Sequence, residues 1–467
     1  MKKSDFISLI LSKLSIVPTK GQKAAIQLFA DYMCCREKDG LMLLKGYAGT
    51  GKTTLVSIFV AALREFGINT VLLAPTGRAA KVLGNYSGKQ AYTIHKEIYR
   101  IKVSKDGMER LVLKKNEHRN TIFFVDEASM IYDVRQTDTS TLFSDTNLLE
   151  DLFVYVGEGI NCRLIFIGDT AQLPPVGLSY SPALDADFLR DSFSRLIFNC
   201  ELTEVVRQVK KSGILYNATK IRYLIGNQSE KTYSFVVDKF TDVEEIPTNQ
   251  LLEKLETAYQ QSDYSNVVLI TLSNKQANLL NKAIRAQILY REEELERNDL
   301  IMNVKNNYYW LDKDSDIQFI ANGDMMKIVK IRGEEQRYGF RFMDVRLRFM
   351  DYSEEEVEAK LILDALYAEG AAMSSQSRKD LFNFVMLDYM HLPTRKKRFE
   401  ATRNDPYLNA LQVKFAYAQT CHKTQGGQWD ISFIYQGYLS GAMLGNDYHR
   451  WLYTAVTRAK KKMYWVR

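Results

Sequence analysis

Short apolar runs alternate with longer amphipathic stretches over most of the chain. In the N-terminal half, apolar runs of four or five residues occur at 41–44, 71–74, 122–125 and 163–167. Short runs rich in branched or aromatic side chains indicate strands buried on both faces of a parallel sheet. Helical patterns follow several of them, and Thr19 is placed to cap a helix that starts near residue 20. The pattern predicts an α/β core.

A second series of apolar runs predicts a second α/β core in tandem with the first. It begins at residues 267–271, resumes at 431–435 and ends at 463–466. We assign residues 1–205 to the first core, and 206–317 together with 411–467 to the second.

Two segments interrupt these cores. Within 318–410, residues 340–349 alternate between polar and apolar as a half-exposed strand does, whereas 354–369 and 378–399 have a helical pattern. We therefore expect an inserted β-plus-α subdomain there. The segment at about 85–120 is polar and basic, and it predicts a small hairpin insert in the first core.

Composition narrows the class of protein. The chain has 467 residues, of which 46% are hydrophobic and 25% charged, a globular balance with room for about three domains. A net charge of +7 permits a nucleic-acid partner without requiring one. No apolar run approaches the ~20 residues of a membrane span, and no secretion signal is evident. The five cysteines form no CxxC or zinc pattern, so we expect buried thiols, a cytoplasmic protein and no membrane partner.

A glycine-rich segment follows the first apolar run. It reads Gly46-Tyr47-Ala48-Gly49-Thr50-Gly51-Lys52-Thr53 and fits the pattern G-x-x-x-x-G-K-[ST], with a strand predicted before it and a helix after it. Glycines let backbone N–H groups surround phosphate oxygens, and the helix N-terminus favours an anion. Lys52 places a positive charge at the β- and γ-phosphates, and Thr53 offers a hydroxyl to Mg²⁺. The segment predicts a nucleotide phosphate loop.

Two further strand ends carry groups suited to phosphoryl chemistry. Asp126 and Glu127 follow the run 122–125; Asp126 is placed to hold Mg²⁺, and Glu127 to orient or deprotonate a water. Gln172 follows the next strand and is suited to sensing the γ-phosphate. Without the phosphate loop, an Asp-Glu pair is usually a surface pair and the Gln172 segment an ordinary turn.

Two arginines stand out, one at the start of the second core and one near its end. Arg207 stands in LTEVVRQ and Arg458 in YTAVTRAKK. An arginine that reaches across a cleft between cores stabilises the charge of a transferring phosphoryl group. A lone arginine is more often a surface or ion-pair residue, so this role is a hypothesis.

The order of these motifs resembles superfamily 1 helicases, in particular the RecD/Dda-like 5′-to-3′ branch called superfamily 1B, in its bacterial or phage form. The matching segments are Gln22, GYAGTGKTT at 46–54, APTGRAAKVL at 74–83, TIHK at 93–96, VDEASM at 125–130, IGDTAQLPPVG at 167–177, LTEVVRQ at 202–208, AQTCHKTQGG at 418–427 and YTAVTRAKK at 453–461. Gln428 departs from the acidic residue that the family often carries there. The resemblance implies two RecA-like cores, a strand-separating pin at about 85–120 and an SH3-like subdomain at 318–410.

The resemblance also implies roles for individual residues. Lys52, Asp126, Glu127, Gln172, Arg207 and Arg458 would be catalytic. ATP would be held by Gln22 at the adenine and by Gly46, Ala48, Gly49, Thr50, Gly51, Lys52, Thr53, Thr54 and Gly427. Mg²⁺ would be bound by Thr53 and Asp126. DNA would contact Pro75, Thr76, Arg78, Thr93, His95, His422, Lys423 and Thr424.

The sequence thus predicts a monomeric, ATP-dependent motor that moves 5′-to-3′ on single-stranded DNA and separates strands at a fork, in contact with repair or recombination proteins. One alternative is a nucleic-acid-binding subunit that ATP switches between conformations and that does not unwind alone. A small-molecule kinase is a weaker alternative, because it has no use for a second core or for Arg458, about 400 residues from the phosphate loop.

Overall fold

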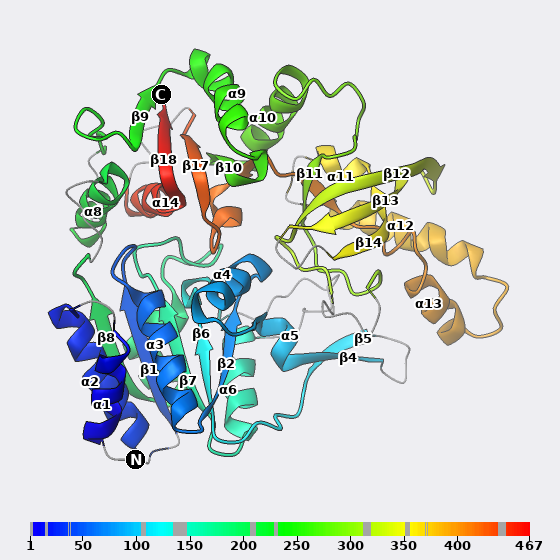
Figure 1. Ribbon diagram of the computed structural model, residues 1–467. Helices are drawn as coiled ribbons and strands as arrows, with labels where there is room; N and C mark the ends of the chain where they lie inside the picture. Colours follow the sequence, from blue (N-terminus) through cyan, green and yellow to red (C-terminus); the bar gives the residue numbers. More distant parts are fainter. Residues whose placement is uncertain are drawn as a thin grey trace.

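The structure is a computed structural model with two parallel-sheet cores, an insert of antiparallel strands and a separate hairpin (Figure 1). It describes residues 3–14, 17–35, 37, 39–103, 109–133, 147–205, 212–227, 232–311, 319–350, 355–368, 370, 372–437 and 445–467. Both cores have the all-parallel sheets that the sequence predicted, which confirms the α/β class with two RecA-like cores.

The first core is a six-stranded parallel sheet in the order β3-β2-β6-β7-β1-β8. Its strands are β1 (Gly40–Gly46), β2 (Asn69–Ala74), β3 (Ala91–Thr93), β6 (Thr121–Val125), β7 (Arg163–Gly168) and β8 (Leu196–Leu202). Its helices are α1 (Lys3–Ser12), α2 (Lys20–Cys34), α3 (Lys52–Glu65), α4 (Gly77–Ser87), α5 (Ile94–Ile98), α6 (Leu148–Glu158) and α7 (Ala186–Phe193).

The central strands are apolar throughout because their alternate residues pack on the two opposite faces of the sheet, and both faces are covered. In β1, Met42 and Leu44 pack with the buried residues of α1, α2 and α3. Leu41 and Leu43 pack on the opposite face with those of α6. A strand that is covered on both faces has no position for an exposed polar side chain.

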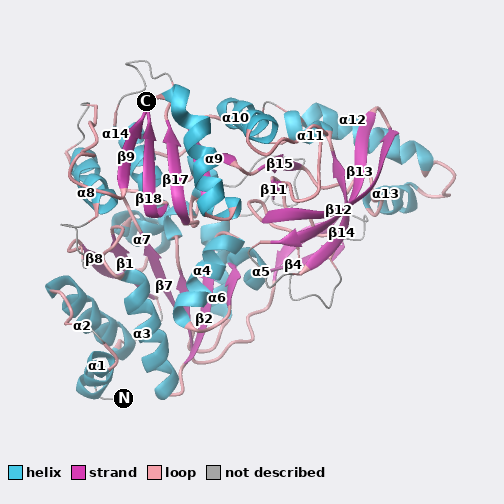
Figure 2. Ribbon diagram, turned by 45° about the horizontal axis from the view of Figure 1, so that its top comes forward, coloured by secondary structure: helices cyan, strands magenta, loops and turns pink. Residues whose placement is uncertain are grey.

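The second core is a five-stranded parallel sheet in the order β16-β10-β17-β18-β9. Its strands are β9 (Val243–Ile246), β10 (Val267–Thr271), β16 (Ala418–Thr420), β17 (Trp429–Tyr435) and β18 (Ala459–Val466), and its helices are α8 (Gly213–Gly226), α9 (Leu251–Gln261), α10 (Asn274–Gln287) and α14 (Asn446–Val456). The helices α14 and α8 pack against each other and against β18, and Figure 2 shows them beside β9 and β18.

The insert is a five-stranded antiparallel sheet in the order β14-β13-β12-β11-β15, with short helices beside it. Its elements are β11 (Leu300–Asn303), β12 (Met325–Arg337), β13 (Phe340–Phe349), β14 (Glu356–Ile362), β15 (Val413–Phe415), α11 (Asp364–Tyr367), α12 (Ser375–Asp388) and α13 (Arg395–Arg403). The strands β11 and β15, which pair with each other at one side of the sheet, lie outside 318–410, so the sheet extends further along the chain than the sequence pattern indicated. The separate hairpin pairs β4 (Tyr99–Val103) with β5 (Glu109–Leu113) within the segment expected to hold one.

Some local expectations were wrong. The segment 354–369 was expected to be helical, but β14 occupies Glu356–Ile362 and only the short α11 is helical. The signal was present as an alternation, because Val357, Ala359 and Leu361 are buried at every second position. The segment 378–399 is not one helix, since α12 ends at Asp388 and the side chain of Thr394 caps a new helix. Of the five cysteines expected to be buried, only Cys421 is buried; Cys34 is exposed, and Cys35, Cys162 and Cys200 are half-buried.

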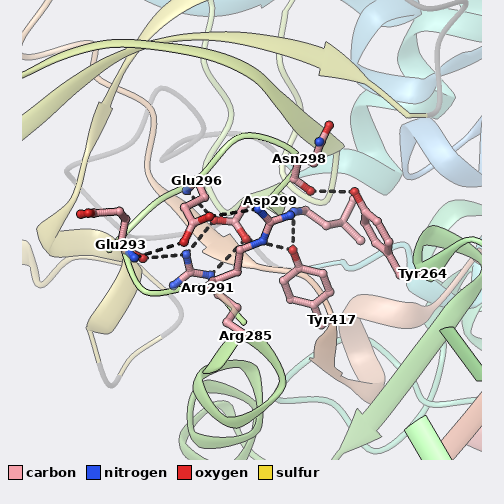
Figure 3. A network of polar contacts seen from close by, with 9 residues as sticks. Tyr264, Arg285, Arg291, Glu293, Glu296, Asn298, Asp299 and Tyr417 are labelled. Atoms are coloured by element: carbon pink, nitrogen blue, oxygen red, sulfur yellow. Dashed lines mark hydrogen bonds and ion pairs between the residues drawn. The ribbon is translucent and has the colours of Figure 1, made fainter. Parts of the chain in front are cut away.

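A buried polar network ties the insert to the second core (Figure 3). Asp299, just before β11, forms an ion pair with Arg285 of α10, and both side chains are almost fully buried. The Asp299 carboxylate also accepts hydrogen bonds from the Tyr417 hydroxyl at 3.0 Å and from the Glu296 N–H at 2.7 Å. Tyr417 in turn accepts a bond from the Leu300 N–H at 3.0 Å. The strand that opens the insert is thus fixed to the core at its first residue.

None of the helices in the described ranges is both long enough and apolar enough to span a bilayer.

Candidate functional site between the two cores

The glycine-rich segment forms a loop between β1 and the N-terminus of α3. Gly49 and Gly51 have φ values of 78° and 87°, a left-handed conformation that glycine adopts without strain. The Lys52 ammonium folds back over the loop and donates to the carbonyl oxygens of Gly46 and, at 3.1 Å, Tyr47. The loop therefore places a cation beside the N-terminus of α3, where the backbone N–H groups of a helix favour a phosphate group.

Gln22 lies directly beneath this loop. The Thr19 side chain accepts a hydrogen bond from the Gln22 N–H, and the Gln22 side chain accepts one from the Thr19 N–H at 3.1 Å, which forms a complete capping box at the start of α2. The other end of the same amide, Nε2, donates to the Thr50 carbonyl at 3.1 Å. The predicted N-cap at Thr19 is thus confirmed, and Gln22 links that cap to the phosphate loop.

Asp126 and Glu127 follow β6 at the edge of the sheet where the phosphate loop lies. Asp126 accepts a hydrogen bond from the Glu127 N–H at 2.9 Å. Glu127 has a φ of 51°, which is strained for a residue with a side chain and is typical of functional positions. Burial raises the pKa of both carboxyl groups, that of Glu127 to about 7, while the charge of Arg458 opposes the rise at Glu127.

The charge that acts on the Glu127 carboxylate from the second core is that of Arg458. It stands between α14 and β18, and it is 3% exposed. Its guanidinium donates to the carbonyl oxygens of Thr454 at 3.0 Å and Gly427 at 3.2 Å. The structure therefore brings Lys52, Asp126 and Glu127 of one core together with Arg458 and Gly427 of the other. Arg207 lies outside the described residues.

Gln172 lies in the loop after β7, which α14 of the second core covers. The Leu173 N–H donates to the Thr454 hydroxyl at 2.9 Å, and the Gln425 side-chain amide donates to the Leu173 carbonyl at 2.7 Å. The Arg450 guanidinium donates to the Gln172 carbonyl at 3.3 Å. Arg450 also donates to the Thr170 carbonyl, so residues of the second core hold the backbone on both sides of Gln172.

The segment around Gly427 also meets α4. The Arg78 guanidinium stacks on the Trp429 ring, with 3.8 Å between them. A Cβ at Gly427 would lie 2.6 Å from the Trp429 ring and 2.9 Å from the Arg78 side chain, so only glycine fits there. Arg78, expected at DNA, is engaged here in a contact between the two cores.

The residues expected at DNA divide into two groups. Pro75, Thr76, Thr93 and His95 line a cavity of about 790 Å³ between the first core and the insert. Its opposite wall includes Tyr308, Tyr309, Arg378 and Arg403. Burial lowers the pKa of His95 to about 4, which leaves its ring uncharged at neutral pH.

The second group, His422, Lys423 and Thr424, forms a short 3-10 turn at the end of β16, away from this cavity. His422 is exposed, whereas the Thr424 hydroxyl is buried and donates to the Cys421 carbonyl at 2.8 Å. Burial lowers the pKa of the Lys423 ammonium to about 8. The structure thus presents His422 to solvent and occupies the Thr424 hydroxyl internally.

Several buried polar atoms in the cleft have no hydrogen-bond partner among the described residues. They are Glu127 Oε2, Ser129 Oγ and Gln172 Oε1. Buried polar atoms are normally paired, so a cluster of exceptions marks a place where a polar group binds. Carboxylate and hydroxyl oxygens from Asp126, Glu127 and Thr53 are also the ligands that suit Mg²⁺. The cleft therefore fits a magnesium-bound nucleotide.

Sequence reasoning missed the residues of the second core that meet the loop after β7. Tyr453 and Thr454 were noted only as letters of the motif that ends in Arg458, and Arg450 was not noted at all. The signal is their spacing: 450, 453, 454 and 457 fall on one face of a helix. That face could be recognised only if 446–456 was known to be helical and its partner loop was known.

Comparisons with known proteins agree with this arrangement. The AAA domain family matches residues 18–223, and the UvrD-like helicase C-terminal domain family matches residues 415–466. The chain is 26% identical to the ATP-dependent DNA helicase dda of Enterobacteria phage T4 over 96% of this chain and 99% of that protein. It is 29% identical to the ATP-dependent RecD2 DNA helicase of Deinococcus radiodurans over 43% of this chain and 24% of that protein.

Among solved structures, one of forked-DNA unwinding by two coordinating Pif1 helicases aligns with 96% of this chain and 92% of that chain, at 15% identity and a TM-score of 0.49.

A triphosphate-binding loop in one parallel-sheet core and a facing arginine in a second core define the class of ATP-hydrolysing motor enzymes. The matches in both cores, and the relative that spans the whole chain, support a superfamily 1B helicase of the RecD and Dda type.

Proposed function

We propose that this helicase uses ATP hydrolysis to move 5′-to-3′ along single-stranded DNA and to separate the strands at a fork. The observation that carries the proposal is the meeting of Lys52, Glu127 and Arg458 in one cleft, with contributions from both cores. Both relatives described above are named as ATP-dependent DNA helicases, and one of them is matched over its whole length.

Each residue of the cleft has its own role in ATP binding or hydrolysis. Lys52 and the loop N–H groups bind the β- and γ-phosphates of ATP, and Gln22 is placed to recognise the base. Glu127 accepts a proton from the attacking water, which Gln172 helps to orient, and Arg458 stabilises the charge that develops on the transferring group. Thr53 and Asp126 would hold Mg²⁺, which supplies charge neutralisation at the phosphates when bound.

Closure of the cleft couples this chemistry to movement. Arg458, Gly427 and the residues that hold the Gln172 loop all come from the second core, so hydrolysis weakens contacts that span both cores. The DNA strand would run through the cavity lined by Thr76, Thr93 and His95, and on to His422 and Lys423 of the second core. A change in the distance between the cores then shifts the strand, a hinge-type transition.

The ATP site is tested with Lys52→Ala. We expect loss of DNA-stimulated ATP hydrolysis by at least about a hundredfold, because the phosphates lose their main cation. The rate is measured with DNA and with RNA oligomers of equal length, which also tests the choice of nucleic acid. A Lys52→Ala protein that still hydrolyses ATP in response to DNA would refute the assignment of the site.

Direction and autonomy are tested with forked duplexes that carry a single overhang. The purified chain is expected to unwind substrates with a 5′ overhang. Faster unwinding from a 3′ overhang would contradict the polarity. DNA-stimulated hydrolysis without any unwinding would instead favour an ATP-switched subunit that acts with repair or recombination proteins, and light scattering with and without DNA checks the expected monomer.

A further inference from the structure

One tyrosine hydroxyl joins three segments that are far apart in the sequence. The Tyr453 ring, on α14 of the second core, is 1% exposed. Its hydroxyl accepts a hydrogen bond from the Ala48 N–H of the phosphate loop at 2.9 Å. The same hydroxyl donates to Asp169 Oδ2, in the loop after β7, at 2.7 Å. The Tyr453 hydroxyl thus connects the second core to both the phosphate loop and the Gln172 loop.

Each partner of this hydroxyl belongs to a working part of the cleft. Ala48 is the third residue of the phosphate loop, whose N–H groups are the donors available to phosphate oxygens. Asp169 accepts a second hydrogen bond, from the Ala171 N–H at 2.9 Å, with its other oxygen. Asp169 therefore fixes the start of the short segment that ends at Gln172 and connects that segment to Tyr453.

The hydroxyl is suited to this place because it both donates and accepts while remaining uncharged. Burial, helped by the nearby Asp169 carboxylate, raises the pKa of Tyr453 well above its usual range. A phenylalanine would fill the same space and leave both Ala48 N–H and Asp169 Oδ2 without this partner. Buried polar groups that lose a partner carry the full cost of their lost hydration.

We propose that Tyr453 is a positioning residue that sets the relation between the phosphate loop and the Gln172 loop only when the two cores are together. Separation of the cores withdraws the hydroxyl from Ala48 and Asp169 at the same time. Both loops of the first core thereby respond to the position of the second core. The inference rests on the proposed ATP-driven function, and it adds a contact that does not itself touch the reacting atoms.

The test compares Tyr453→Phe with a matched variant of the same helix. The Tyr448 hydroxyl is likewise held, donating to Gln436 Oε1 at 2.6 Å, but within the second core. Steady-state ATP hydrolysis is measured at saturating single-stranded DNA. For Tyr453→Phe we expect kcat to fall about tenfold while KM for ATP changes less than about twofold, because positioning acts on the closed state and not on nucleotide capture. For Tyr448→Phe, neither parameter changes.

A double-variant cycle tests whether Tyr453 acts through Asp169. If Tyr453 acts through Asp169, then Asp169→Asn alone lowers kcat, and Asp169→Asn with Tyr453→Phe loses little more than the worse single variant. A Tyr453→Phe enzyme with wild-type kcat would overturn the inference, as would losses that multiply in the double variant. Absence of DNA-stimulated hydrolysis in the wild-type chain would instead count against the proposed function.

Discussion

The second core contacts both the insert and the first core. The two contacts differ in whether their central buried oxygens have hydrogen-bond partners. At the junction with the insert, both oxygens of Asp299 are occupied, by Arg285, Tyr417 and the Glu296 N–H (Figure 3). At the cleft with the first core, buried oxygens of Glu127 and Gln172 have no partner among the described residues. A buried carboxylate whose two oxygens are both paired holds its neighbours together, whereas unpaired buried oxygens leave places for a ligand. The insert is therefore expected to move with the second core, and the cleft to open and close.

The largest effect is expected on stability, from a substitution that disrupts the junction between the insert and the second core. Asp299→Ala leaves the Arg285 guanidinium buried without its partner, which typically destabilises a protein by about 3–5 kcal/mol. Urea unfolding followed by circular dichroism measures the loss. Asp187→Ala is the control, because its ion pair with Arg190 is exposed and such pairs contribute little. Equal unfolding midpoints for the two variants would contradict a stabilising role for the network.

The role of Glu127 in the cleft is tested by the pH dependence of ATP hydrolysis. Because the pKa of Glu127 is raised to about 7, its carboxyl is protonated below that pH and cannot accept a proton from water. ATP hydrolysis at saturating ATP and DNA should rise with pH through about 7 and level off above 8. Glu127→Gln should abolish hydrolysis while nucleotide binding persists. A wild-type rate that is flat from pH 6 to 8 would argue against Glu127 as the base.

A smaller effect is expected from the stacking of Arg78 on Trp429. The contact is of a kind that contributes about 0.5–2 kcal/mol, and it exists only when α4 and the second core meet. Tryptophan fluorescence during titration with a non-hydrolysable ATP analogue reports on it. Trp429→Phe should remove most of the nucleotide-dependent signal, whereas Trp310→Phe should leave it, because the Trp310 ring N–H donates to the Asn409 carbonyl, away from the contact with α4. The reverse outcome would place the moving contact elsewhere.

The sequence predicted what depends on local pattern. The apolar runs predicted the inner strands of both core sheets because parallel strands covered on two faces have few alternatives, but not the edge strands β3, β8, β9 and β16. The loop at 46–53 was recognisable because phosphate binding demands glycines at fixed spacing. The sequence did not predict β14, because Glu356, Glu358, Ala359 and Lys360 are residues that favour a helix, and only the alternation with Val357 indicates a strand. It also could not assign Tyr453 or Trp429, since their roles depend on how two separately folded sheets meet.

The side-chain amide of Gln22 has a consequence for base selection. Its oxygen closes the capping box with Thr19, and its nitrogen holds the Thr50 carbonyl. A purine that formed hydrogen bonds with this amide would have to take it from one or both of these neighbours. Occupation by a base would then loosen the first turn of α2 or relax the phosphate loop. Hydrogen exchange at the amides of residues 19–23 would thus distinguish a bound nucleoside triphosphate from a bound inorganic triphosphate.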